Sequence, residues 1–444
     1  MTLLECVEGL PVRLALIYWV ASFIVLLLRL FTPDFEKLAA YGGHGGSASS
    51  GARTHAAQGS AAARGDKKSK AGGAHTWPFF FTAAIQASPL GTRKVSRKQA
   101  FTSFYVTGLA TSALLLAAHF SEYLRSADPS LLYPTCLSAV PLVLFFLHCG
   151  VRLAETRRVQ RFRAGDTVTL FAAIAGCTFY TAAAASSSLP PANLSELSSR
   201  WMFESTNIQW MIVTGAVTHV WVQVVQVMVH TILAGLRRQA ETRKSETTEE
   251  SQELKESVWR YVQKGLLSCK KTKEKRGGHA DEPYALHGSW RTYHFPYSPN
   301  PVFQCVLDPH YTCEIVLYSV NTVLMLLCSW PHPLLQEDAD AEHTLWHYSC
   351  APMAWLSVVA GAGVTLFTLV NLGITSAGHR RFWSASNDAR REVAGVLTGL
   401  LSASPEVGNG GRLPAELVDK ATQMLQEDLV EEMLPRWNVI PFIW

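Results

Sequence analysis

Four groups of polar side chains recur at helical spacing near the ends of long apolar runs in this sequence. Side chains spaced in this way share one face of a helix. An ionisable side chain at the edge of hydrocarbon is costly, so it serves a function or is paired inside a helix bundle. A cavity lined by Arg, His, Tyr and Asn would suit a ligand with phosphates at one end and an apolar partner deeper in the membrane. The groups are His148, Arg152 and Glu155; Gln223, Gln226 and His230; Tyr311, Glu314 and Tyr318; and Asn371, Thr375 and His379.

Each group taken alone has a simpler interpretation. Arg152 would be an interfacial arginine whose head reaches toward water, with Glu155 as its salt-bridge partner. The stripe of Gln223, Gln226 and His230 would form hydrogen bonds between neighbouring helices. Only convergence of several polar faces on one side of a bundle would favour a binding site.

The elements that must position these residues are membrane helices. The chain has 444 residues, of which 48% are hydrophobic and 17% charged, and a helix needs about 20 apolar residues to cross a bilayer. The sequence therefore predicts an all-α, polytopic membrane helix bundle with about seven transmembrane helices. We interpret the first span as a retained anchor, because no small-residue cleavage site of a signal peptide follows it cleanly. The expected spans are 13–32, 102–120, 131–151, 167–187, 208–234, 311–330 and 351–377.

The distribution of basic residues predicts the orientation. Lys and Arg gather in the segments after the first, third, fifth and seventh spans, and positive loops stay cytoplasmic. The loop 331–350, on the opposite side, contains acidic residues and no Lys or Arg. We expect a lumenal N-terminus and a cytosolic C-terminus. The glycosylation sequon Asn193-Leu194-Ser195 falls in an expected lumenal loop, which agrees with this topology.

Cysteine spacing and net charge narrow the function classes. The nine cysteines include no CxxC pair, so we expect neither a metal site nor a disulfide scaffold. The net charge of +4 follows from the topology and gives no support for nucleic-acid binding.

The segment before the sixth span resembles the signature of the steroid 5-alpha-reductase family. In that family an Arg/His-Ile-Pro element precedes a Pro-Asn/His-Tyr-x-x-Glu motif, and here Tyr293–Pro296 precedes Pro309–Glu314. The chain end Ile440–Trp444 is similar to the family's tail. The polyprenol (polyprenal) reductase branch is the most similar, through residues 147–155 and 230–237. The resemblance covers about residues 90–238, 290–383 and 433–444.

This resemblance implies an enzyme of the endoplasmic reticulum membrane that uses NADPH to reduce the alpha-isoprene double bond of polyprenal or polyprenol. The reaction supplies dolichol, the lipid carrier for protein N-glycosylation, so the implied partners are a long-chain polyprenyl lipid and the membrane. Hydride would add to the beta carbon, and a proton would follow at the alpha carbon. The implied residues are Tyr311, Glu314, His379, His148 and Tyr180 for catalysis, and Arg152, Arg237, His294, His310, Asn371, Arg381 and Trp383 for NADPH binding.

Three alternatives remain open on the sequence. A very-long-chain enoyl-CoA reductase shares the C-terminal fold, but it typically has a ubiquitin-like region that residues 1–90 do not resemble. A steroid 5-alpha-reductase has a Tyr where Cys149 follows His148 here. From a different class, the chain could be a lipid-binding or scaffold protein whose polar helix ends are interfacial anchors.

Composition and the family resemblance together imply the boundaries of seven segments. Residues 415–433 are amphipathic, and we expect them to lie on the membrane surface or to pack against the bundle. The segments are an anchor helix at 1–36, a cytosolic low-complexity linker at 37–90, the first part of the bundle at 91–238, a cytosolic insertion at 239–289, the C-terminal reductase part at 290–383, a second cytosolic insertion at 384–432, and the tail at 433–444.

Overall fold

The computed structural model describes most of the long apolar segments of the chain. The described residues are 10–31, 84–126, 129, 132–162, 165–189, 206–246, 253–254, 257–260, 262, 301–329, 344–402, 415–427, 429 and 433–439. They belong to two compact units. The first unit comprises residues 1–43, 63–231 and 309–374, and the second unit comprises 44–62, 232–308 and 375–444.

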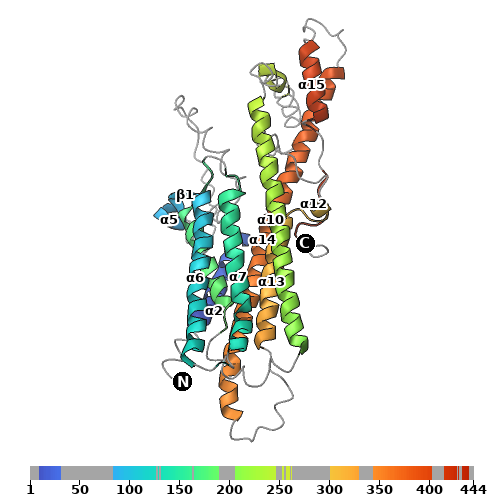
Figure 1. Ribbon diagram of the computed structural model, residues 1–444. Helices are drawn as coiled ribbons and strands as arrows, with labels where there is room; N and C mark the ends of the chain where they lie inside the picture. The colour runs from blue at the N-terminus through green and yellow to red at the C-terminus, as the bar shows by residue number, and fades with distance from the viewer. Residues whose placement is uncertain are drawn as a thin grey trace. The chain divides into compact units, whose positions relative to one another are not determined.

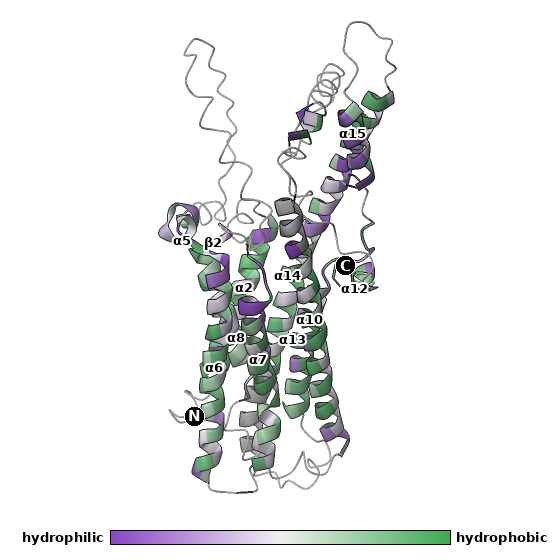
Figure 2. Ribbon diagram, turned by 45° about the horizontal axis from the view of Figure 1, so that its top comes forward, coloured by the Kyte–Doolittle hydropathy of each residue, from purple (hydrophilic) through white to green (hydrophobic). Residues whose placement is uncertain are grey.

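Long apolar helices dominate the described part of the chain, and six of them are long and apolar enough to cross a membrane. Figure 2 shows hydrophobic residues along α6, α7, α10 and α13. The prediction of an all-α, multi-pass membrane bundle is confirmed in this form. The helices are α2 (Leu10–Phe31), α6 (Arg97–Ser126), α7 (Leu132–Arg158), α10 (Thr206–Glu246), α13 (Pro309–Ser329) and α14 (Thr344–Ser402).

A seventh apolar helix, α8 (Leu170–Ser186), coincides with the expected span 167–187. It has 17 residues, fewer than the about 20 that a full crossing needs. The count of seven spans and the orientation of the termini therefore stay predictions. The remaining described helices are α5 (Pro89–Thr92), α12 (Pro301–Cys305) and α15 (Ala415–Glu427).

A small sheet ties the starts of α6 and α8 together. Strand β1 (Lys94–Ser96) pairs antiparallel with β2 (Thr167–Thr169), with Val95 opposite Val168. Thr169 then caps α8, because its hydroxyl accepts a hydrogen bond from the main-chain nitrogen of Ala172 at 3.1 Å. This pairing is the exception to the all-α architecture among the described residues.

Small residues let α6, α7 and α8 pack closely in the first unit. Helix α6 packs against both α7 and α8 (Figure 1). A Cβ atom on Gly176 of α8 would lie 2.3 Å from the ring of Phe104. A Cβ atom on Gly108 of α6 would lie 2.7 Å from the sulfur of Cys149 on α7. Close helix approach through glycines is a common way to pack helices in membranes.

Two side chains of α13 donate hydrogen bonds to main-chain carbonyls of α7 around a proline inside that helix. Pro141 has no N–H, so the carbonyl of Leu137 lacks its helical hydrogen bond. The thiol of Cys328 donates to that carbonyl at 3.8 Å, and Asn321 Nδ2 donates to the carbonyl of Pro141 at 3.4 Å. Hydrocarbon offers no water for such carbonyls, so these contacts position α13 against α7.

Helix α14 continues beyond the expected end of the seventh span. Its 59 residues amount to about 88 Å of helix, whereas the hydrocarbon core is about 30 Å thick. The boundary expected between residues 383 and 384 therefore falls inside a continuous helix. Helix α10 likewise runs eight residues past the boundary expected at 238, to Glu246.

The amphipathic segment forms α15, whose apolar face is covered by protein. In the second unit Ala421 and Met424 of α15 join one apolar cluster with Val393 and Leu397 of α14 and with Val262. Figure 2 shows hydrophilic residues over much of α15. Of the two expectations for this segment, the structure shows packing against protein.

The chain end is held in the second unit by main-chain hydrogen bonds. Val306 and Trp437 form a parallel bridge. The nitrogens of Leu307 and Asp308 donate to the carbonyls of Trp437 and Asn438, each at 3.0 Å. The residues that resemble the family's tail, 440–444, lie outside the described residues.

Candidate functional site

Polar side chains from α7, α10 and α13 meet in the interior of the first unit. We call them the polar cluster. Most of its side chains are buried, with 1% of Gln226 and 2% of His148 exposed, and the Glu314 side chain is the more open at 14%. The polar cluster consists of His148, Arg152 and Glu155 of α7; Gln223, Gln226 and His230 of α10; and Glu314 of α13.

One part of the polar cluster is centred on Arg152. Its guanidinium donates to Glu155 Oε2 one helical turn away. Its Nη1 lies 2.8 Å from Nδ1 of His230, and this same ring nitrogen lies 3.1 Å from Glu155 Oε1. The guanidinium also lies over the ring of Tyr105, 5.4 Å from its centroid. The neighbouring His230 and Tyr105 lower the cost of burying this ion pair, and Arg152 Nε has no hydrogen-bond partner among the described residues.

The other part is a closed ring of four side chains. His148 Nδ1 lies 2.6 Å from Gln223 Oε1. Gln223 Nε2 donates to Gln226 Oε1 at 3.2 Å, and Gln226 Nε2 donates to Glu314 Oε2 at 2.6 Å. The ring closes where Glu314 Oε1 comes within 3.3 Å of His148 Nε2. Three helices are thus joined through one chain of polar contacts.

Tyrosines border the polar cluster on its apolar side. The ring of Tyr318 lies edge-on to His148, with 6.1 Å between ring centroids. The ring of Tyr180 lies edge-on to Tyr105 at 5.1 Å. A tyrosine hydroxyl can donate a hydrogen bond to an oxygen on which negative charge develops. The arrangement therefore combines a carboxylate, an imidazole and phenols within a membrane bundle.

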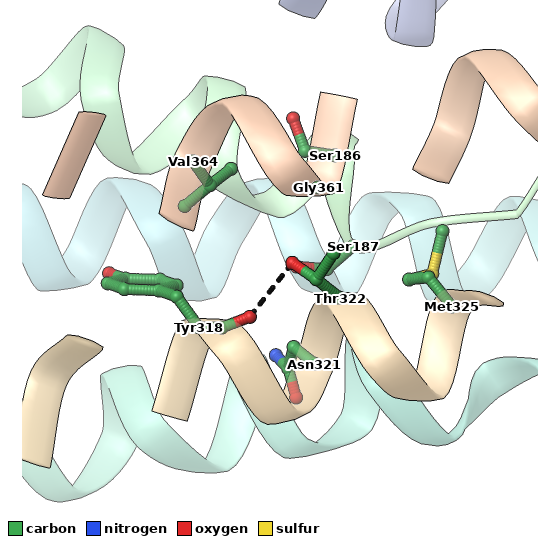
Figure 3. A pocket seen from close by; sticks show the side chains of 8 residues that line it. All are labelled: Ser186, Ser187, Tyr318, Asn321, Thr322, Met325, Gly361 and Val364. Atoms are coloured by element: carbon green, nitrogen blue, oxygen red, sulfur yellow. Dashed lines mark hydrogen bonds between the residues drawn. The ribbon is translucent and has the colours of Figure 1, made fainter. Parts of the chain in front are cut away.

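A small pocket lies next to Tyr318 (Figure 3). Its lining includes hydroxyls of Ser187 and Thr322, and the Thr322 hydroxyl donates to the carbonyl of Tyr318 at 3.0 Å. The space suffices for about one water molecule. The pocket is lined by Ser186 and Ser187 of α8, by Tyr318, Asn321, Thr322 and Met325 of α13, and by Gly361 and Val364 of α14.

The structure brings together part of the site predicted from the sequence. In the first unit His148, Arg152 and Glu314 belong to the polar cluster. His310 touches its edge, because its carbonyl accepts from Gln226 Nε2 at 3.3 Å. The neighbouring predicted residues are Tyr180, beside Tyr105, and Tyr311, whose ring lies 4.2 Å from that of His310.

Asn371 has a different environment in the first unit. Its Oδ1 accepts a hydrogen bond from Arg29 Nη1 of α2 at 2.6 Å. The expected convergence of all four polar faces is thus shown for α7, α10 and α13. The polar face of α14 contributes none of the residues that define the polar cluster.

The second unit holds the other described residues of the predicted site. His379 Nδ1 lies 3.1 Å from both carboxylate oxygens of Asp308, and Ser376 donates to the same carboxylate. Arg237 and Arg381 are exposed, whereas Trp383 is buried. His294 lies outside the described residues.

Sequence reasoning assigned no role at the site to Glu155, Gln223, Gln226, His230 or Asp308, which the structure places at these sites. Gln223 and Gln226 were recognised as a stripe, but spacing alone does not reveal that they link His148 to Glu314. Asp308 was not singled out. Its only sequence signal is its position directly before the Pro309–Glu314 motif.

A comparison of the chain with protein-family models, with curated proteins and with solved structures found no match. The interpretation of the site therefore rests on its geometry and on the resemblance of its motifs.

Proposed function

We propose that this protein reduces the alpha-isoprene double bond of polyprenal or polyprenol with NADPH, in dolichol biosynthesis for protein N-glycosylation. The observation that supports this most is the polar cluster. Seven polar side chains, two of them carboxylates, converge inside an apolar bundle. Burying such groups costs stability unless they are paired, and ionisable residues within membrane segments commonly mark functional sites. An anchor or scaffold would not need them.

The reaction requires one group that supplies a proton to the substrate and one that stabilises negative charge on the carbonyl oxygen. When bound, NADPH would supply the hydride that adds to the beta carbon. As the carbon–carbon double bond is reduced, negative charge develops on the conjugated carbonyl oxygen, and a positioned donor lowers that barrier. The hydroxyls of Tyr180 and Tyr311 are of the required type. The carboxyl group of Glu314 and the imidazole of His148 can hold a proton.

The donor set fits a phosphorylated dinucleotide. Exposed guanidinium groups are suited to phosphates, because they carry a permanent charge and several donors. Arg237 and Arg381 are exposed and meet this requirement. Arg152 is buried and engaged by Glu155 and His230. Because their guanidinium groups are exposed, we favour Arg237 and Arg381 as phosphate ligands.

We further infer an endoplasmic reticulum location with the cofactor side facing the cytosol. The basic segments after the first, third, fifth and seventh spans support this orientation. His310 and Tyr311 lie in the first turn of α13, at the end that this orientation places toward the cytosol. NADPH would then reach the site from the aqueous side and the polyprenyl chain from the membrane.

Substrate turnover tests this proposal. The purified protein in liposomes is given NADPH and, in parallel, polyprenal, a very-long-chain enoyl-CoA and a 3-oxo-4-ene steroid, and NADPH absorbance is followed. We expect oxidation with polyprenal only, and none with a Glu314→Ala variant. Oxidation with either other substrate would move the function to the corresponding alternative. NADPH binding without any oxidation would favour a lipid-binding role.

A further inference from the structure

The direction of every hydrogen bond in the ring of His148, Gln223, Gln226 and Glu314 can be deduced from one main-chain carbonyl. The carbonyl oxygen of His310 can only accept, and the nearest polar atom of Gln226 lies 3.3 Å away. That atom must be the amide nitrogen. The same nitrogen lies 2.6 Å from Glu314 Oε2, where a donor is also required for an ionised carboxylate.

The orientation of the Gln226 amide determines the orientation of the Gln223 amide and which ring nitrogen of His148 carries a proton. With its nitrogen toward Glu314, Gln226 turns its oxygen to Gln223, which must donate its own amide nitrogen at 3.2 Å. Gln223 then presents its oxygen to His148 Nδ1 at 2.6 Å. An amide oxygen has no proton to donate, so Nδ1 must carry one. The proton content of the ring can vary only between His148 Nε2 and Glu314 Oε1.

The charges of the polar cluster indicate that one proton resides on this pair. The cluster contains two carboxylates, Glu155 and Glu314, and one guanidinium, Arg152. Arg152 is engaged by Glu155. A buried carboxylate without a positive partner is strongly unfavourable, and His148 Nε2 lies 3.3 Å from Glu314 Oε1. A proton on either atom would offset the charge of the Glu314 carboxylate.

We propose that His148 and Glu314 share one mobile proton and that Gln223 and Gln226 are positioning residues that keep His148 in the Nδ1–H form. The proposal rests on the proposed reductase function for one step only, in which this proton is the one consumed per turnover. The Glu314 side chain is 14% exposed and that of His148 is 2% exposed. Glu314 is therefore the member of the pair that can touch a substrate.

When bound, NADPH would supply the hydride that adds to the beta carbon, and the pi electrons of the double bond would move onto the alpha carbon and the carbonyl oxygen. The shared proton passes from Glu314 Oε1 to the alpha carbon, which leaves a carboxylate beside neutral His148. A proton from water then restores the pair. The net reaction is NADPH, one proton and the unsaturated aldehyde giving NADP⁺ and the saturated aldehyde.

The protonation state of His148 can be measured without any substrate. The full-length protein is labelled with nitrogen-15 histidine in nanodiscs, and the His148 signals are identified by their loss in His148→Asn. We expect Nδ1 to be protonated in the wild type. In Gln223→Leu we expect the proton to leave Nδ1, because the acceptor is gone, while the matched variant Gln160→Leu outside the cluster keeps the wild-type signals. A bare Nδ1 in the wild type would overturn the proposal.

Kinetics test the link to turnover. We expect Gln223→Leu and Gln226→Leu to lower kcat for polyprenal by about ten-fold or more, as for a weakened proton transfer, with an unchanged Kd for NADPH. Gln160→Leu should keep the wild-type kcat. Wild-type kcat in both cluster variants would overturn the positioning role. If the wild type oxidises no NADPH while His148 shows the expected nitrogen signals, the reductase function fails and the proton-sharing pair stands.

Discussion

Glu314 Oε1 lies 3.3 Å from His148 Nε2, and this contact joins α13 to α7. Both residues were expected at the site from the sequence, on separate spans. On the opposite side of each residue, Gln226 holds Glu314 and Gln223 holds His148. The contact is thus enclosed by two amides of α10, which restrict both side chains to one arrangement.

Removing the carboxylate of Glu314 tests its role in turnover. Glu314→Gln keeps the size of the side chain but cannot give up a proton. We expect kcat for polyprenal to fall by about 10²–10⁴-fold, the range for loss of a general acid. Glu416→Gln, at an exposed position of α15, should retain wild-type kcat. Wild-type turnover of Glu314→Gln would exclude this residue from the chemistry.

The pair of Arg152 and Glu155 is expected to contribute to stability. Glu155→Leu leaves a buried guanidinium without its carboxylate, and breaking a buried pair in this way costs about 3–5 kcal/mol. The double variant Arg152→Met/Glu155→Leu should lose less, because no charge is left unpaired. Thermal unfolding in detergent measures both. Equal destabilisation of the two variants would contradict this account.

Arg237 is proposed to meet a phosphate of NADPH. Arg237→Ala should weaken NADPH binding by about 1.5–3 kcal/mol, the value of a hydrogen bond to a charged group, or roughly ten-fold to hundred-fold in Kd. The adjacent exposed Arg238→Ala provides the matched control. Titrating each variant with NADPH while following protein fluorescence measures the two dissociation constants. An unchanged Kd in Arg237→Ala would remove this residue from the cofactor site.

Asp308 is expected to orient His379 through its two contacts of 3.1 Å. If His379 acts in the reaction, Asp308→Asn should lower kcat. A variant of the neighbouring tail contact, Asn438→Ala, should mainly lower the unfolding temperature, because Asn438 contacts Arg380 rather than His379. A kcat that does not change in Asp308→Asn would show that His379 needs no such support.

The packing of α6 against α8 and α7 predicts opposite effects for Gly176 of α8 and Gly150 of α7. Gly176→Ala would place a methyl group 2.3 Å from Phe104, and such overpacking typically costs about 1–3 kcal/mol. Gly150→Ala meets its nearest side-chain atom at 3.9 Å, so it should gain up to about 1 kcal/mol from the better helix former. Unfolding temperatures in the same detergent compare the two. Similar values would argue against this packing.

Hydropathy was sufficient to locate the long helices but not their ends. The pattern placed each of the six long apolar helices, because a bilayer demands continuous apolar runs. The apolar run was expected to end at residue 377, and the family resemblance placed a boundary after Trp383. The structure continues α14 to Ser402, since residues such as Arg390 and Leu397 are compatible with helix whether they face lipid, water or protein. Composition changes at a membrane surface, whereas a helix need not end there.

Helical spacing likewise revealed part of the site. It showed that Gln223, Gln226 and His230 share a face, and that Arg152 and Glu155 can pair. It could not show which helices face one another, so the contacts of Gln226 with Glu314 and of Gln223 with His148 were not foreseen. Asp308 lies outside the helical pattern, and its contact with His379 depends on how the chain enters α13.

The fate of the hydride of NADPH tests the proposed reductase reaction most directly. The purified protein in liposomes is given polyprenal and NADPH that carries deuterium at the transferred position, and the product is analysed by mass spectrometry. We expect deuterium on the beta carbon and a solvent hydrogen on the alpha carbon. Deuterium on the aldehyde carbon, or an unreduced double bond with measurable NADPH binding, would contradict it.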